Sequence, residues 1–288
     1  MMHDQAASLR RQLEISKNPR QARTIAVVSG KGGVGKSNVA LNFSLELLNQ
    51  DKKVLLLDLD VGMGNIDILL GLHSEKTIVD MFTDHLSVHD IIKTGPRDLA
   101  YVAAGSGLTD LFMMDQEKRD YFYQQYDELV KMYDYIIFDM GAGATNDSLS
   151  LIIASDECIV VTTPEPTSIT DAYGMIKHIL NKQRNMPISV IMNRSASLKS
   201  GYQALDRFQR VVTQFLDVEI HKLGILPDDK IVSTAVIRQI PYVLLNEKAA
   251  VSKAIREIAS NYTTYGTEYQ QQKSTSFVKR LKQFMMER

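Results

Sequence analysis

Runs of apolar, often β-branched residues recur along the chain at strand length, and segments with helical apolar spacing separate them. Several runs are apolar at nearly every position, which is typical of strands buried on both faces of a parallel sheet. The predicted strands are 24–30, 54–60, 101–105, 135–140, 158–163, 188–193 and 221–226. The predicted helices are 36–49, 118–132, 145–155, 168–184, 202–216 and 248–262. This alternation predicts an α/β fold with a doubly wound, mostly parallel sheet and helices on both faces.

The two ends of the chain differ from this alternating core. Polar segments without apolar periodicity, 16–23 and 263–276, are predicted to be linkers. The expected organisation is an N-terminal helix with its linker (1–23), a core domain (24–262) and a C-terminal linker with a helix (263–288). Both ends are net basic, although the whole chain carries a formal net charge of only -1.

Composition narrows the classes of function. The chain has 288 residues and is 44% hydrophobic, which is enough for one large α/β domain or two small ones. Cys158 lies in an apolar run and is the only cysteine, so an internal disulfide or a cysteine metal cluster is excluded and a reducing compartment is expected. The sequence has no apolar signal-peptide stretch and no run long enough to span a bilayer, so we expect a cytoplasmic protein.

The stretch SGKGGVGKSN, residues 29–38, fits the phosphate-loop pattern G-x-x-x-x-G-K-[ST] between a predicted strand and a predicted helix. Its glycines let backbone N–H groups turn toward an anion, and the helix N-terminus favours phosphate. Lys36 is expected to reach the β- and γ-phosphates, and Ser37 to bind Mg²⁺. The candidate nucleotide-binding residues of this loop are Gly30, Lys31, Gly32, Gly33, Val34, Gly35, Lys36, Ser37 and Asn38.

Three aspartates stand at or near the carboxyl ends of predicted strands. Asp58 and Asp60 are two apart, so their side chains point the same way. Carboxylates beside a phosphate loop suit Mg²⁺ coordination through water and alignment of an attacking water. Asp139 ends another apolar strand and is expected to hold Mg²⁺ through water. Because no His or Glu is placed as a general base, positioning and electrostatics are expected to carry a slow reaction.

Three motifs together resemble the MinD/ParA class of ATPases with a deviant Walker A motif. KGGVGKS contains the extra Lys31, VLLLDLDVGMGNID resembles the next family motif, and YIIFDMGAG resembles the Walker B and switch segment. The resemblance implies a homodimer formed with ATP and Mg²⁺, in which Lys31 contacts the phosphates held by the other subunit. It also implies that Asp60 positions the attacking water and that Asp58 supports the metal.

Side-chain chemistry at a strand end and the same resemblance together suggest where the base binds. Asn193 and Arg194 follow a strand, and an amide can bond the adenine edge while a guanidinium can stack on the ring. Pro227 and Asp228 fall where the family closes the base pocket, and Glu165 matches a residue that reaches the partner's nucleotide. The alternative for Asn193, Arg194, Pro227 and Asp228 is ordinary loop chemistry.

The last sixteen residues contain a single apolar stripe. Its members recur at i, i+1, i+4, i+7 and i+8, and they are Phe277, Val278, Leu281, Phe284 and Met285. The segment resembles the membrane-targeting helix of MinD, which implies peripheral binding to an anionic membrane surface on the inner face of the cell membrane. One copy should bind weakly, whereas the two copies of an ATP dimer should bind much more tightly. The alternative is a helix docked on the protein's own core.

The first residues favour one branch of the class. DQAASLR, residues 4–10, resembles the arm of the flagellar-number ATPases (FlhG or YlxH), which stimulates FlhF-type GTPases. The resemblance implies control of flagellar number and placement, with flagellar basal-body components as further candidate partners. The expected contacts with the GTPase are Gln5, Ala6, Leu9 and Arg10.

Other functions compete with this interpretation. A MinD-type regulator of the division site would share the C-terminal helix. A bacterial tyrosine kinase would need a tyrosine cluster, for which only Tyr262, Tyr265 and Tyr269 are available. A DNA-segregating ParA is disfavoured because the chain has no overall basic surface, so no nucleic acid is expected. Iron–sulfur carriers of this fold are excluded by the missing cysteines.

Overall fold

The computed structural model describes residues 21–60, 64–105, 116–143, 146–269 and 276–286. Eight strands form one sheet in the order β3-β4-β2-β5-β1-β6-β7-β8, and every neighbouring pair is parallel except β3 and β4. The strands are β1 (Arg23–Val28), β2 (Val54–Leu59), β3 (Lys93–Thr94), β4 (Ala100–Val102), β5 (Tyr135–Met140), β6 (Glu157–Thr162), β7 (Ile188–Ser195) and β8 (His221–Pro227). The predicted fold class is confirmed.

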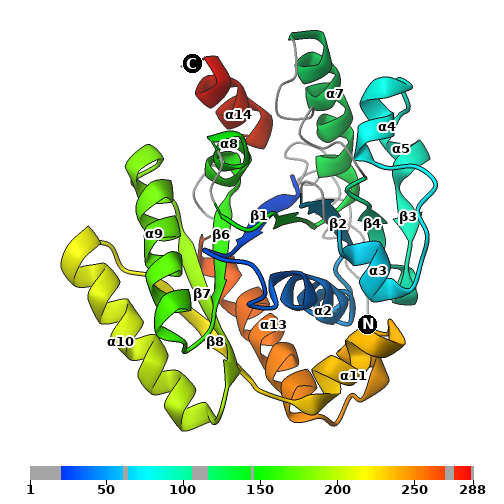
Figure 1. The fold of residues 1–288 in the computed structure, drawn as a ribbon. Coiled ribbons are helices and arrows are strands. Elements are labelled where there is room, and N and C mark those ends of the chain that lie inside the picture. Colours follow the sequence, from blue (N-terminus) through cyan, green and yellow to red (C-terminus); the bar gives the residue numbers. More distant parts are fainter. Residues whose placement is uncertain (1–20, 61–63, 106–115, 144–145, 270–275, 287–288) are drawn as a thin grey trace, which may run out of the picture.

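Helices cover both faces of the sheet (Figure 1). Six helices match those predicted in the core, and they are α2 (Lys36–Leu48), α7 (Gln116–Met132), α8 (Asn146–Ala154), α9 (Pro166–Lys182), α10 (Leu198–Leu216) and α13 (Ala250–Tyr269). The other described helices are α3 (Ile66–Leu70), α4 (Ile78–Thr83), α5 (Val88–Ile91), α11 (Lys230–Arg238), α12 (Tyr242–Leu245) and α14 (Phe277–Met286), with a 3-10 turn at Pro96–Asp98. All six helices predicted for the core are therefore present.

The sheet separates two apolar cores. Along β1, Ile25 and Val27 belong to the core beneath α2 and α13, whereas Ala26 and Val28 belong to the core beneath α7, α8, α9 and α10. Successive side chains of a strand point to opposite faces, so a strand covered on both faces must be apolar at every position. This is why the strand runs in the sequence do not alternate between apolar and polar residues.

One strand and one helix end differ from the sequence prediction. Strand β3 was not predicted, because its two residues are too few to form a pattern. The segment 263–276 was predicted to be a linker, but α13 continues to Tyr269. A polar residue of this extension has a partner in a distant segment: the hydroxyl of Thr263 donates at 2.6 Å to Oε1 of Gln50, in the turn after α2. Polarity alone therefore did not mark the end of the helix.

Helix α14 is docked on α8 and α7, which is the alternative that the sequence left open. Phe277, Val278 and Leu281 of the apolar stripe are buried in the core, and the Phe277 ring lies 4.3 Å from the ring of Tyr126. Phe284 is partly buried, and the side chain of Met285 lies outside the described residues. In this conformation the described side chains of the stripe face the protein rather than a membrane. None of the described helices is long and apolar enough to cross a membrane.

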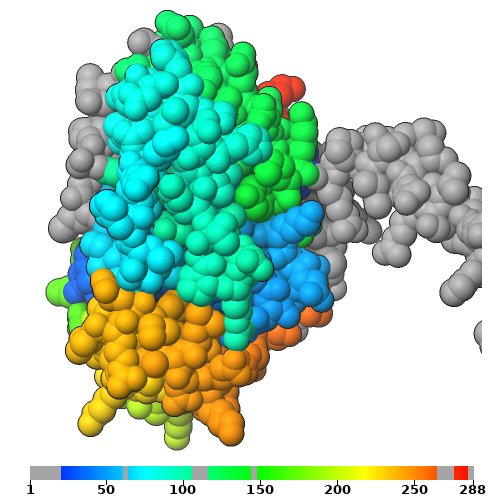
Figure 2. All heavy atoms as spheres, turned by 90° about the vertical axis from the view of Figure 1, so that its right-hand side faces the viewer, coloured from blue at the N-terminus to red at the C-terminus, as the bar shows by residue number. Residues whose placement is uncertain are grey.

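Two segments that are distant in the sequence, α3 and α11, also meet at the surface. The end of α3 and the end of α11 pack side by side (Figure 2), and a Cβ on Gly71 would lie 3.1 Å from Cβ of Gln239. Both residues have a positive φ, as is common where a helix ends.

Candidate nucleotide-binding site

The phosphate loop connects the carboxyl end of β1 to the start of α2. Gly33 and Gly35 have φ values of 79° and 92°, a region that glycine occupies without steric cost. Gly30 is required for a different reason, since a Cβ there would lie 2.2 Å from the backbone carbon of Asp171 in α9. The sequence thus folds the loop into a tight cradle and lets α9 approach it closely.

Lys36 is buried at the base of the loop. Its ammonium lies 2.5 Å from Asp139 Oδ1 and 3.3 Å from the hydroxyl of Ser37. The second oxygen of Asp139 is buried and has no hydrogen-bond partner among the described residues. The predicted loop lysine, metal-binding hydroxyl and Walker B carboxylate therefore lie together, with one carboxylate oxygen available to a new donor or a cation.

Asp58 lies beside Asp139, because the two residues are register partners on β2 and β5. Burial, and then the negative charge of Asp139, raise the pKa of Asp58 to about 7. Its oxygens accept the backbone N–H groups of Asp60 (3.1 Å), Asn65 (2.7 Å) and Ile66 (3.0 Å). Asp58 therefore fixes the loop after β2, a structural task that its position in the sequence did not indicate.

The two buried carboxylates fit a divalent cation, whose charge would relieve their repulsion. Ser37 supplies a hydroxyl ligand and Asp139 supplies the unpaired oxygen. The described residues contain no group of three or more His, Cys, Asp or Glu side chains that could hold a metal without further ligands. Phosphate oxygens and water would have to complete the coordination, as is usual for Mg²⁺.

Asp60 is half-buried at the point where three segments of the site meet. Burial raises its pKa, while Lys36 lowers it and Asp139 raises it further. A Cβ on Gly141 would lie 3.3 Å from Asp60 Oδ1, so the segment after β5 passes directly beside this carboxylate. The N–H of Gly143 donates to the carbonyl of Ser29 at 3.1 Å and joins the predicted switch segment to the phosphate loop.

The second lysine of the loop, Lys31, is held by the start of α9. Its ammonium lies 3.1 Å from Glu165 Oε2 and 3.0 Å from the hydroxyl of Thr167. The sequence placed Glu165 near a partner's nucleotide, whereas in this single chain it forms an ion pair with Lys31. Thr167 was missed, because only the fold brings it next to a residue 136 positions away.

A cavity of about 690 Å³ lies next to the loop and brings together the residues assigned to the base. The amide of Asn193 donates to the carbonyl of Val34 at 2.8 Å and so attaches the end of β7 to the phosphate loop. The predicted residues that line this cavity are Gly35, Asn38, Glu165, Asn193, Arg194, Pro227 and Asp228. Residues that sequence reasoning missed are Val39, Asp229, Val232, Ser233, Val236, Ile237, Tyr242 and Val251. The apolar repeat IVSTAVI in α11 was the available signal for four of them.

The N-terminal contacts predicted for a GTPase, Gln5, Ala6, Leu9 and Arg10, lie outside the described residues.

Comparisons with known proteins agree with this geometry. Residues 20–263 match the family described as "ParA: NUBPL iron-transfer P-loop NTPase". The chain is 32% identical to the antiactivator FleN of Pseudomonas aeruginosa over 84% of this chain and 87% of that protein. It is 30% identical to the flagellum site-determining protein YlxH of Helicobacter pylori over 99% of this chain and 100% of that protein. Among solved structures, the cell division ATPase MinD of Pyrococcus furiosus superimposes with a TM-score of 0.70 at 25% identity, over 85% of this chain and 99% of that chain.

Proposed function

Because the chain belongs to the ParA/MinD family of P-loop ATPases, we propose that it is a dimerising switch, dependent on ATP and Mg²⁺, that controls flagellar number and placement. The flagellar role is supported by the names of two relatives, an antiactivator and a flagellum site-determining protein. It is supported also by the sequence DQAASLR near the N-terminus.

One observation supports the proposed dimer most directly: the two lysines of the loop contact different parts of the chain. Lys36 is buried against Asp139, whereas the ammonium of Lys31 extends from the loop to Glu165 and Thr167. A cation on this accessible side can be presented to phosphates bound by a second copy. There it would stabilise the negative charge that develops during phosphoryl transfer. Hydrolysis would then depend on the dimer.

Within one subunit, the loop N–H groups and Lys36 would bind the phosphates. For this, the Lys36 ammonium must exchange Asp139 for phosphate oxygens. Ser37 and Asp139 would hold Mg²⁺, which supplies positive charge to the β- and γ-phosphates. Asp60 would orient the attacking water, and the bond from its N–H to Asp58 fixes its backbone.

Membrane association would require release of α14 from the core. The guanidinium of Arg280 donates to the carbonyl of Ala154 at 2.7 Å and to Asp156 at 2.6 Å, at the carboxyl end of α8. Helix α8 follows the switch segment directly. A movement of that segment on dimerisation can therefore reach the surface on which α14 rests. The expected result is a peripheral protein that binds the inner face of the cell membrane as the ATP dimer.

The dimer is tested by measuring mass with light scattering, with and without Mg-ATP. The unmodified chain should be a monomer alone and a dimer with Mg-ATP. Lys36→Gln should stay monomeric, because it loses phosphate contacts. Asp60→Ala should form the dimer but lose hydrolysis. A single mass for all three proteins under both conditions would show that Lys31 does not act across subunits.

The flagellar assignment is tested separately with a peptide of residues 1–23 and an FlhF-type GTPase. On a helix, Gln5 and Leu9 share a face, and the Gln5 amide can orient a water or brace a loop. The peptide should raise the GTPase rate without the core. Gln5→Ala should lose most of this stimulation and Arg11→Ala less. An unchanged rate at saturating peptide would favour the division-site alternative.

A further inference from the structure

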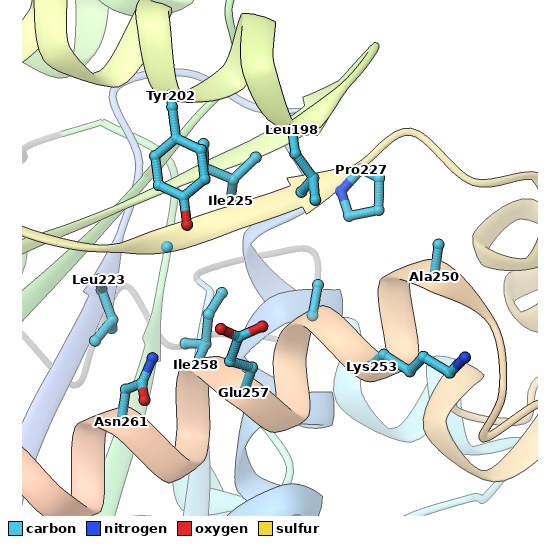
Figure 3. A pocket seen from close by; sticks show the side chains of 12 residues that line it. Leu198, Tyr202, Leu223, Ile225, Pro227, Ala250, Lys253, Glu257, Ile258 and Asn261 are labelled. Atoms are coloured by element: carbon cyan, nitrogen blue, oxygen red, sulfur yellow. The ribbon is translucent and has the colours of Figure 1, made fainter.

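The edge strand β8 borders a groove that the nucleotide chemistry does not use. β8 is the last strand of the sheet, and its outer edge has no partner strand among the described residues. A cavity of about 400 Å³ runs along this edge between α10 and α13. Figure 3 shows Leu198 and Tyr202 on one side of β8, with Ala250, Lys253, Glu257 and Asn261 of α13 on the other. We refer to this cavity as the β8 groove.

The two walls of the β8 groove differ in chemistry. On the α10 side, Leu198 and Tyr202 are 55% and 51% exposed, which is high for large apolar side chains one helical turn apart. On the α13 side, Ala250 and Ala254 are small and leave room next to the strand. An edge strand offers unpaired backbone N–H and C=O groups. The groove therefore combines backbone bonding capacity with an apolar wall.

Two opposite charges lie on the α13 wall. The carboxylate of Glu257 points into the groove, and the side chain of Lys253, one helical turn away, extends along α13 away from Glu257 (Figure 3). No ion pair joins either side chain to another part of the chain that the structure describes. Four residues of a helix rise about 6 Å. Same-face side chains of an extended strand are about 6.6 Å apart, so a strand lying along β8 would match this spacing.

We propose that the β8 groove binds an extended peptide segment of a partner protein as an additional strand. The segment has a basic, an apolar and an acidic residue in succession. The basic and acidic side chains pair with Glu257 and Lys253. The apolar residue between them points to the opposite wall and contacts Leu198 and Tyr202. This is strand addition to a sheet edge, with specificity from alternate side chains.

The edge itself favours a short peptide over a second copy of the chain. The pairing of β8 with β7 shifts register between Val190 and Ile191, so Leu223 is an irregularity in the strand. Lys222, at the start of β8, is already paired with Asp206 at 2.8 Å. Bulges and charged residues are devices that prevent edge-to-edge pairing of whole strands. The cavity lies along the short stretch from Leu223 to Pro227, where Pro227 can offer only its carbonyl to an added strand.

The test uses three fluorescein-labelled heptapeptides, TVKLDVT, TVKLKVT and TVDLDVT, with fluorescence anisotropy on the full chain. The unmodified chain should prefer TVKLDVT. Glu257→Lys, with two lysines on the wall, should prefer TVDLDVT, and Lys253→Glu should prefer TVKLKVT. The preferred peptide should bind with about fivefold higher affinity than the other two, which is what an exposed ion pair contributes. This difference in affinity should disappear in 1 M salt. This design works whichever way the peptide runs.

Two controls separate strand addition from simple charge attraction. Tyr202→Ser should weaken binding of all three peptides, whereas Phe215→Ser, at a 66% exposed aromatic on the same helix but outside the groove, should not. Two forms of TVKLDVT, one N-methylated at the leucine and one N-methylated at both the lysine and the aspartate, should bind with different affinities, because only alternate N–H groups of an added strand face β8. The proposal is overturned if no peptide binds at millimolar concentration, or if all three bind the three proteins equally. It is also overturned if the chain without nucleotide is a dimer that Tyr202→Ser dissociates, since the occupant is then a second copy.

Discussion

A substitution in the surface on which α14 rests should release α14 while leaving the residues of α14 itself unchanged. Asp156 accepts a bond from Arg280 at 2.6 Å, and its other oxygen accepts the N–H of Thr24 at 2.8 Å. Asp156→Asn keeps the size of the side chain and an acceptor for Thr24, but it removes the negative charge opposite Arg280. Because the apolar stripe lies entirely on α14, the affinity of the released helix for lipid stays the same.

The magnitude follows from the burial of this pair. The side chains of Arg280 and Asp156 are 16% and 18% exposed, so the ion pair is largely but not wholly shielded from water. Hydrogen bonds to charged groups contribute about 1.5–3 kcal/mol. Arg280 keeps its bond to the carbonyl of Ala154, so we expect the lower end, about 1.5 kcal/mol, or about tenfold in the docking equilibrium. Phe277 and Leu281 remain buried in the docked state, which should still dominate without lipid.

Hydrogen–deuterium exchange of the nucleotide-free chain measures this equilibrium directly. In Asp156→Asn, the amides of 277–286 should exchange about tenfold faster, and binding to anionic liposomes should rise. Asp206→Asn breaks an exposed ion pair with Lys222 far from α14, so it should leave both measurements unchanged. The reasoning is refuted if 277–286 exchange at the original rate. It is refuted equally if exchange accelerates throughout the chain, because the substitution then destabilises the whole fold.

Three further predictions concern the site and the helix. Gly30→Ala should weaken nucleotide binding at least tenfold in a titration with fluorescent ATP, because its Cβ would overlap the backbone of Asp171 in α9. Thr167→Val removes one of the two partners of Lys31 and should lower the ATP concentration needed for half-maximal dimerisation about threefold, as measured by light scattering; an unchanged midpoint would show that this bond does not restrain Lys31. Phe284→Glu should abolish liposome co-sedimentation in Mg-ATP while leaving the ATPase rate in solution unchanged, and sedimentation equal to that of the unmodified chain would exclude α14 as the membrane contact.

The sheet could be predicted from the sequence because strands buried on both faces form continuous apolar runs. The residues of 135–140 and 158–162 are buried at every position, and each run ends where the polar chemistry begins. The closeness of Asp58 and Asp139 to the phosphate loop could be predicted in the same way, because the carboxyl ends of parallel strands meet at one edge of the sheet. Their register pairing then places the two carboxylates side by side.

Contacts between distant segments could not be predicted in the same way. Nothing near Lys31 in the sequence indicates that Thr167 will bind it, since only the packing of α9 on the loop brings them together. Helix α11 was not predicted, although its apolar repeat was visible in the sequence. Only Ala235 of this helix is buried, and several of its other apolar residues line the cavity next to the phosphate loop. The stripe of α14 showed which side of the helix is apolar, but periodicity cannot distinguish a core from a membrane as the surface that covers it.

The pairing of both loop lysines with carboxylates has a consequence for how a nucleotide arrives. Lys31 is balanced by Glu165 and Lys36 by Asp139, and Asp58 and Asp60 lie close by. Without a metal, the loop therefore presents almost no net positive charge to a polyphosphate in solution. Association should accordingly depend little on ionic strength, unlike the steered encounters of sites with bare cations. A cation that accompanies the nucleotide would supply the missing charge, so we expect the loop to accept a metal–nucleotide complex in preference to the free polyanion.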